Sequence, residues 1–172
     1  MARVASCQVP EGSLLADCRR DGAYADCYVA EIDRAVTLTQ FVEAFYTSRI
    51  FRLERLILKW WLSRPSTDDD ARALAAGAAD TFAAWRVESR RADEILLADF
   101  TGRTRSWLKT LPVAGPHTCL YFGSAVIPMR DATTGQPSLG RTFELLLGFH
   151  KLYSRVLLAA TRAKLYRPGR SQ

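Results

Sequence analysis

The sequence predicts an α+β domain in which an antiparallel meander sheet grips a long C-terminal helix, with an N-terminal strand and two or three further helices. Three observations predict this class. Apolar residues recur at three- and four-residue steps along residues 138–165, which is the spacing of one helix face. Hydrophobicity alternates with a period of two after Thr81, as it does in strands. Between Thr37 and Leu62 the helical period is found again.

The composition is that of a single globular domain. The chain has 172 residues, of which 48% are hydrophobic, and this is enough for one core. No apolar run is long enough to span a bilayer, and the first fifteen residues lack a signal-peptide pattern. We therefore expect a soluble cytoplasmic protein without a transmembrane segment. Residues 1–25 are expected to be an extended lead-in with at most a short helical turn, 26–166 the domain and 167–172 a basic tail.

Charge and cysteine content narrow the possible partners. The formal net charge is +6, and the seven basic residues and one acidic residue after position 140 account for it. A solvated helix face beside a basic tail explains this pattern, so we expect no nucleic-acid partner; an anionic surface is the alternative. The four cysteines (Cys7, Cys18, Cys27 and Cys119) lack paired spacing, and the chain has two histidines. We expect free thiols, no metal and no cofactor.

The elements before the meander follow in order. Residues Asp26–Asp33 alternate as a strand. Thr37–Leu62 is predicted to be a helix that breaks at Tyr46–Ser48, where small hydroxyl residues lower helix propensity. Thr67 then caps a short helix, whose first-turn aspartates favour the helix dipole. Gly77 ends this helix.

The meander and the final helix make up the second half of the chain. Gly123 lies inside the last strand and predicts a bulge or a close approach of another segment. The final helix is expected over residues 138–165, with Ser138 as its N-cap. Turn-forming residues separate four predicted strands, which are Thr81–Ser89, Glu94–Phe100, Arg103–Leu111 and Thr118–Met129.

Tight turns would determine which side chains share a face of the sheet. With such turns, Trp107 lies opposite Phe122. Trp85 lies opposite Ala98 on the same face. This face is almost wholly apolar, and we expect the final helix to cover it. Its predicted members are Trp85, Val87, Leu96, Ala98, Phe100, Trp107, Leu120, Phe122 and Val126.

A wedge between a curved sheet and a helix laid across it is where small-ligand sites form. No nucleophile–base pair, metal triad or phosphate loop can be assembled from local spacing, so no catalytic or metal-binding residue is assigned. The predicted ligand-binding residues are Trp85, Arg105, Trp107, Phe122, Ser124, His150 and Tyr153.

Two of these residues have open interpretations. Arg105 is predicted to be buried opposite Ser124, where a guanidinium needs a partner. That partner is either a carboxylate or the acidic end of an apolar ligand, unless a one-residue shift in register turns Arg105 outward. His150 is either a core histidine bonded to a hydroxyl or carbonyl, or a proton donor and acceptor in the pocket. The candidate carboxylates for Arg105 are Glu43, Glu54 and Glu144.

The order of elements over about residues 26–165 resembles the helix-grip (START-like or SRPBCC-like) fold of lipid-transfer domains, plant pathogenesis-related allergens and aromatic polyketide cyclases, with fewer strands than the full pattern. The last helix also resembles that of an uncharacterised bacterial domain family. Its signature residues are here Gly140, Arg141 and Phe143, followed by Phe149, His150, Lys151 and Leu152. The aromatic, Arg-rich helix over residues 41–61 is similar too. That family has no assigned activity, so the resemblance implies a bacterial, cytoplasmic, single-domain protein and carries over no functional residue.

These observations support three hypotheses. The first is a module that binds a hydrophobic or amphipathic small molecule between the sheet and the C-terminal helix. The second is a structural or interaction protein that uses either its basic C-terminal helix or an apolar patch on the outer face of the sheet to bind a protein partner or to form a homodimer. The third is a cyclase- or dehydratase-like enzyme, with His150 as acid–base and Arg105 stabilising an enolate-like oxygen. The predicted outer patch consists of Ile95, Leu97, Leu108, Tyr121 and Ile127.

Overall fold

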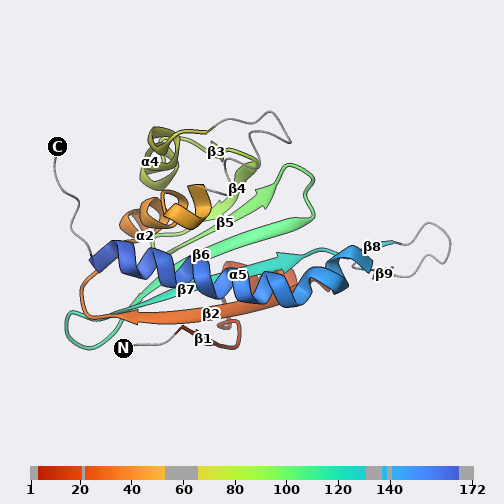
Figure 1. Cartoon of the computed structure of the whole chain (residues 1–172), viewed down its shortest axis with the longest axis horizontal. Coiled ribbons are helices and arrows are strands. Elements are labelled where there is room, and N and C mark those ends of the chain that lie inside the picture. Colours follow the sequence, from red (N-terminus) through yellow and green to blue (C-terminus); the bar gives the residue numbers. More distant parts are fainter. Residues whose placement is uncertain (1–3, 21, 53–65, 131–136, 139–140, 167–172) are drawn as a thin grey trace.

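The protein is an antiparallel sheet with helices packed on both of its faces. Figure 1 shows the C-terminal helix running across one face of the sheet. The helix Leu14–Arg20 packs against the opposite face. No helix among the described residues combines the length and the apolar character that crossing a bilayer requires. The computed structural model describes residues 4–20, 22–52, 66–130, 137–138 and 141–166.

The sheet has seven strands in the order β1-β2-β7-β6-β5-β4-β3. The early strand β2 pairs along its whole length with β7, so that two segments far apart in sequence lie together under the C-terminal helix (Figure 1). The strands are β1 (Ala5–Ser6), β2 (Tyr24–Ile32), β3 (Thr81–Phe82), β4 (Trp85–Arg90), β5 (Glu94–Asp99), β6 (Thr104–Pro112) and β7 (Thr118–Val126), and a separate pair is formed by β8 (Met129–Arg130) and β9 (Pro137–Ser138).

The helices begin and end where local sequence signals place them. Helix α2 starts with a capping box, in which the Thr37 side chain accepts the Gln40 N–H and the Gln40 side chain accepts the Thr37 N–H. It ends at Tyr46, and residues 49–52 are helical again, which confirms the predicted break. Residues 53–62 of that prediction lie outside the described part of the chain. Besides this short stretch, the helices of the described residues are α1 (Leu14–Arg20), α2 (Leu38–Tyr46), α4 (Asp68–Ala76) and α5 (Arg141–Tyr166).

Helix α4 confirms both of its predicted ends. Thr67 caps it, since its side chain accepts the Asp70 N–H and the Asp70 carboxylate accepts the Thr67 N–H. Gly77 closes it in the left-handed conformation, with φ of 75°, a value that glycine adopts without a steric penalty.

The larger differences from the prediction are in three places. Helix α5 begins at Arg141, and Ser138 belongs to β9 instead of capping the helix. The strand predicted over Thr81–Ser89 is divided into β3 and β4 by a turn in which Ala83 has φ of 52°. The segment before Asp26, which was expected to be extended with at most a short helical turn, contains β1 and the seven-residue helix α1.

Two apolar clusters occupy the two faces of the sheet. The cluster under α2 and α5 is rich in aromatic rings, and Leu157 and Leu158 of α5 are fully buried in it. The cluster on the other face forms between the sheet and α1, around Leu15 and Trp107. The rings of the first cluster are Tyr28, Phe41, Phe45, Tyr46, Phe51, Phe82 and Phe122.

The predicted register is wrong by one residue at two interfaces. Trp107 pairs with Gly123 instead of Phe122, and Trp85 pairs with Asp99 instead of Ala98. Because side chains alternate along a strand, each one-residue shift moves the affected side chains to the other face relative to their neighbours. Trp107 therefore lies on the α1 face, whereas Phe122 lies on the α5 face. Phe100, a predicted core residue, is 53% exposed.

Candidate functional site

Asp26 and Ser124 face α5 from two neighbouring strands. Asp26 on β2 pairs directly with Ser124 on β7, so the two side chains point to the same face. The Ser124 hydroxyl donates to Oδ1 of Asp26 at 2.7 Å. Both side chains are almost fully enclosed, with the Asp26 side chain 11% exposed. The pair is a charged contact within a largely apolar face, on which Ser106 is also buried and polar.

His150 reaches this pair from α5. Its Nε2 lies 2.7 Å from Oγ of Ser124 and 3.5 Å from Oδ2 of Asp26. The Ser124 hydroxyl has one proton, which it donates to Asp26, so its oxygen accepts from His150. Nε2 of His150 therefore carries a proton. The His150 side chain is 27% exposed, so this polar cluster lies at the edge of the core.

Tyr28 completes the cluster of Asp26, Tyr28, Ser124 and His150. The Tyr28 hydroxyl donates to Oδ2 of Asp26 at 3.4 Å, and the guanidinium carbon of Arg155 lies 5.6 Å from the Tyr28 ring centroid. Burial, together with the negative charge of Asp26, raises the pKa of Tyr28 above its ordinary value. Tyr28 therefore stays protonated at neutral pH and acts as a donor.

Asp26 is the charged centre of the cluster. Burial acts to raise the pKa of Asp26, but the hydrogen bonds from His150 and Ser124 outweigh it, and the pKa lies below its ordinary value. The carboxylate is thus ionised at neutral pH. A Ser–His–Asp triad needs the histidine between the other two groups, accepting the serine proton. Here Ser124 gives its proton to Asp26, so the cluster can bind and orient a polar group but does not activate a serine nucleophile.

The structure divides the predicted ligand-binding residues between the two faces. Ser124 and His150 are in direct contact. Phe122 is buried near Phe45, with ring centroids 4.8 Å apart. Trp85 and Tyr153 are partly buried against the same cluster under α5. Arg105 and Trp107 lie away from this group, on the other side of the sheet.

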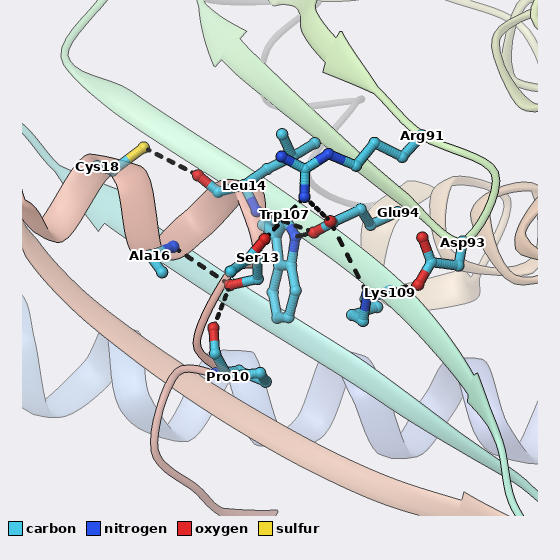
Figure 2. A network of polar contacts seen from close by, with 11 residues as sticks. Pro10, Ser13, Leu14, Ala16, Cys18, Arg91, Asp93, Glu94, Trp107 and Lys109 are labelled. Atoms are coloured by element: carbon cyan, nitrogen blue, oxygen red, sulfur yellow. Dashed lines mark hydrogen bonds and ion pairs between the residues drawn. The ribbon is translucent and has the colours of Figure 1, made fainter.

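Trp107 is fully buried on the α1 side of the sheet. Figure 2 shows the network of polar contacts to which its indole belongs. Its indole N–H donates to Oε2 of Glu94 at 2.7 Å, and the Leu14 N–H donates to the same oxygen at 3.0 Å. Arg91 donates to Oε1 of Glu94 at 2.9 Å. Glu94 is 1% exposed. Trp107 therefore fixes α1 to the sheet and cannot line a space beside His150.

Arg105 has a carboxylate partner that differs from those predicted. Its guanidinium forms an ion pair with Glu88 and donates to the Gly102 carbonyl oxygen. Glu88 lies at the β-bulge between Val87 and Ser89, which a regular alternation does not predict. Arg105 pairs directly with Ala125, whereas Ser124 pairs with Ser106. Arg105 and Ser124 therefore do not meet.

Two members of the cluster, Asp26 and Tyr28, were not predicted as site residues, although the sequence contains a signal for them. Asp26, Tyr28, Ala30 and Ile32 alternate along β2, and the last three are fully buried. A carboxylate on the same strand face as three core residues must find hydrogen-bond donors. This two-residue spacing would have indicated Asp26 as a member of a buried polar cluster.

Other features of the surface are separate from the cluster. An open hollow of about 550 Å³ is lined by residues of the N-terminal segment, on the far side of the sheet from His150. A group of Glu31, Asp33 and His117 brings possible metal-ligating atoms within 4.8 Å of one another. All three side chains are substantially exposed, and such surface groups are common without an ion. The hollow is lined by Val9, Glu11, Gly12, Ala16 and Arg19.

Comparisons with known proteins leave the role of the cluster to be argued from its geometry. No family model matches the chain, and no curated protein matches it. The solved structure of CalU16 from Micromonospora echinospora is similar over 97% of this chain and 98% of that one, with 12% identity and a TM-score of 0.34. A likeness at this level supports no inference about fold or function.

Proposed function

We propose that this protein is a cytoplasmic helix-grip module that binds a hydrophobic or amphipathic small molecule between α5 and the sheet. The observation that carries the proposal is the polar cluster around Asp26. A charged, hydrogen-bonded group lies on a largely apolar face, next to a histidine that is still partly exposed. Sites that bind small apolar ligands are built in this way, from mostly apolar side chains and a few polar groups in fixed positions.

The charges of the cluster indicate which polar group it recognises. Ionised Asp26 only accepts hydrogen bonds, and it already accepts from Ser124 and Tyr28. A ligand hydroxyl or amine can donate to this carboxylate, whereas a ligand carboxylate would be repelled by it. Because Arg105 lies on the other face, the acid-binding role considered for it has no support. We therefore infer an apolar molecule with a hydroxyl or amine group.

Ligand-induced thermal stabilisation tests the proposal. We expect an apolar alcohol, phenol or amine to raise the melting temperature, because a ligand that binds only the folded state stabilises it. Matched carboxylic acids should have a smaller effect. His150→Ala and Asp26→Asn should abolish the shift. Arg105→Ala, on the opposite face, and His117→Gln, at the other histidine of the chain, should retain it.

Two results would contradict the proposal. One is a panel of these compounds that leaves the melting temperature of the wild-type protein unchanged. The other is an equal shift in wild-type protein and in both cluster variants, because binding would then occur elsewhere on the molecule.

The enzyme hypothesis loses its pair of residues. His150 and Arg105 belong to opposite faces, so Arg105 cannot stabilise an oxygen that His150 protonates. Nε2 of His150 is also engaged with Ser124. The geometry thus favours binding over acid–base catalysis.

The interaction hypothesis loses one of its two predicted surfaces, the outer face of the sheet. Ile95, Leu97 and Leu108 are fully buried under α2 and α5 instead of forming an outer patch. A homodimer therefore has no support from that patch, and sedimentation at micromolar concentration tests it directly.

A further inference from the structure

Two cysteines face each other at the edge of the sheet. The short strand β1 pairs with β2 through Ala5↔Val29 and Ser6↔Tyr28, and the next position in this register places Cys7 opposite Cys27. The Cys7 N–H donates to the Cys27 carbonyl oxygen at 2.9 Å. The two sulfur atoms are 3.2 Å apart and share a hydrogen bond. We propose that Cys7 and Cys27 form a reversible disulfide that ties the N-terminal segment to the sheet.

The backbone geometry suits this bond. Residues directly opposite in antiparallel strands have Cα atoms about 4.5–5.5 Å apart, which lies within the range of about 4.4–6.8 Å found in disulfides. Since the bonded S–S distance is about 2.05 Å, the sulfurs need to approach by about 1 Å. Side-chain rotation supplies such a movement without a change in strand pairing.

The two thiols differ in a way that defines their roles. Cys27 is buried beside Leu15 and Trp107, whereas Cys7 is half-buried at the sheet edge. The hydrogen bond with Cys27 lowers the pKa of Cys7 despite its partial burial, and the pKa of Cys27 is raised. Cys7 therefore ionises first and is the thiol that an oxidant reaches.

The reaction with a low-molecular-weight disulfide is balanced. The Cys7 thiolate attacks one sulfur of the oxidant, its S–S bond breaks, and one thiolate leaves. The Cys27 thiol then loses its proton and attacks the Cys7 sulfur, which releases the second thiolate. Two protein thiols are oxidised, and one small disulfide is reduced to two thiols.

The other two cysteines lack this arrangement. Cys18 lies on α1, with its sulfur 3.8 Å from the Leu14 carbonyl oxygen. Cys119 is on β7 opposite Leu111 and Glu31, and burial raises its pKa. They serve as matched controls for the proposed pair.

The disulfide would close a loop of the chain that contains α1 and the residues lining the open hollow. Every residue that lines the hollow falls between positions 7 and 27, and so does α1. Oxidation would therefore limit the opening of this segment, because its two ends could no longer separate. The inference concerns the opposite face from the polar cluster and does not rest on the proposed function.

Thiol counting on the folded, full-length protein tests the proposal. After treatment with oxidised glutathione, we expect two of the four thiols to be lost, with a mass decrease of about 2 Da that dithiothreitol reverses. Trypsin leaves Cys7 and Cys18 in one peptide, so cleavage after Glu11 is needed to separate them. The linked peptides should then contain Cys7 and Cys27.

Single-cysteine variants identify which two thiols form the link. Cys18→Ser and Cys119→Ser should form the same link as wild type. Cys27→Ala should stop at a lasting mixed disulfide of glutathione with Cys7, and Cys7→Ser should form no link. Four thiols remaining in treated wild-type protein would overturn the proposal, as would a link to Cys18 or Cys119. Equally fast, equally selective linking in urea would also overturn it, because strand pairing would then play no part.

Discussion

At the scale of single residues, Gly123 is required by close packing. The sequence predicted either a bulge or a close approach there, and the structure shows the second, since Gly123 stays in register with both Cys27 and Trp107. A Cβ atom at this position would lie 2.4 Å from Cδ2 of Leu15 and 2.9 Å from the Asp26 carbonyl oxygen. Glycine thus allows α1 to approach the sheet.

Gly123→Ala should therefore destabilise the fold by about 1–3 kcal/mol, because overpacking forces both neighbours to shift. Urea denaturation measures this loss. In a Leu15→Ala background the penalty of Gly123→Ala should be smaller, since the nearer obstacle has been removed. Equal penalties in both backgrounds would show that contact with Leu15 is not the cause.

The second residue-scale prediction concerns Asp26 and pH. Its folded-state pKa is lowered relative to an unfolded value of about 3.9. Ionised Asp26 therefore stabilises the fold above that pH, and the contribution is lost as the pH falls through the folded-state pKa. Asp26→Asn should be less stable than wild type by about 1–3 kcal/mol near neutral pH, and the difference should shrink below about pH 4.

Denaturation at a series of pH values measures this difference. Asp69→Asn is the matched control, because the Asp69 side chain is 88% exposed, and its loss should change stability by less than about 1 kcal/mol. If the difference in free energy of unfolding between wild type and Asp26→Asn stayed constant below about pH 4, this would contradict the stabilising role of the ionised carboxylate.

At the scale of elements, some helices are specified locally and others by distant contacts. The capping boxes at Thr37 and Thr67 and the terminal Gly77 are all visible in the sequence. Helix α1 also has a local cap, since the Ser13 hydroxyl accepts the Ala16 N–H, but the buried Glu94 carboxylate, 80 positions away, accepts its Leu14 N–H as well. No local pattern reports the contact with Glu94, and the sequence predicted at most a short helical turn in this segment, whereas α2 and α4 were predicted as helices.

Glu94→Gln should therefore weaken the attachment of α1 to the sheet. An amide has one acceptor oxygen where the carboxylate has two, so at least one donor among Leu14, Trp107 and Arg91 loses its partner. We expect a loss of about 1–3 kcal/mol in the free energy of unfolding and faster proteolysis between residues 9 and 20. Asp93→Ala, which removes a more exposed partner of Lys109, is the control and should cost less than about 1 kcal/mol. Equal losses in the two variants would contradict the anchoring role of Glu94.

At the scale of the whole molecule, the class and the order of elements could be predicted, whereas the faces could not. Both faces of the sheet are buried: β5 carries adjacent buried residues Ile95, Leu96 and Leu97, and β6 carries Trp107 next to Leu108. Alternation identifies a face only when the other face is polar. The register between β5 and β6 was right, but the neighbouring interfaces were each shifted, and the predicted site was divided as a result.

The same two-sided burial predicts how the molecule opens. The cluster under α2 and α5 contains most of the large buried side chains, whereas the cluster under α1 is small. Segments with fewer buried apolar contacts open at lower free energy. In native-state hydrogen exchange, the amides of Leu14–Arg20 should therefore exchange at least about tenfold faster than those of β6 and β7. Glu94→Gln should widen this gap by accelerating α1 alone. Equal protection of α1 and β7 would mean that both faces unfold as one cooperative unit, and α1 would then be as integral to the fold as α5.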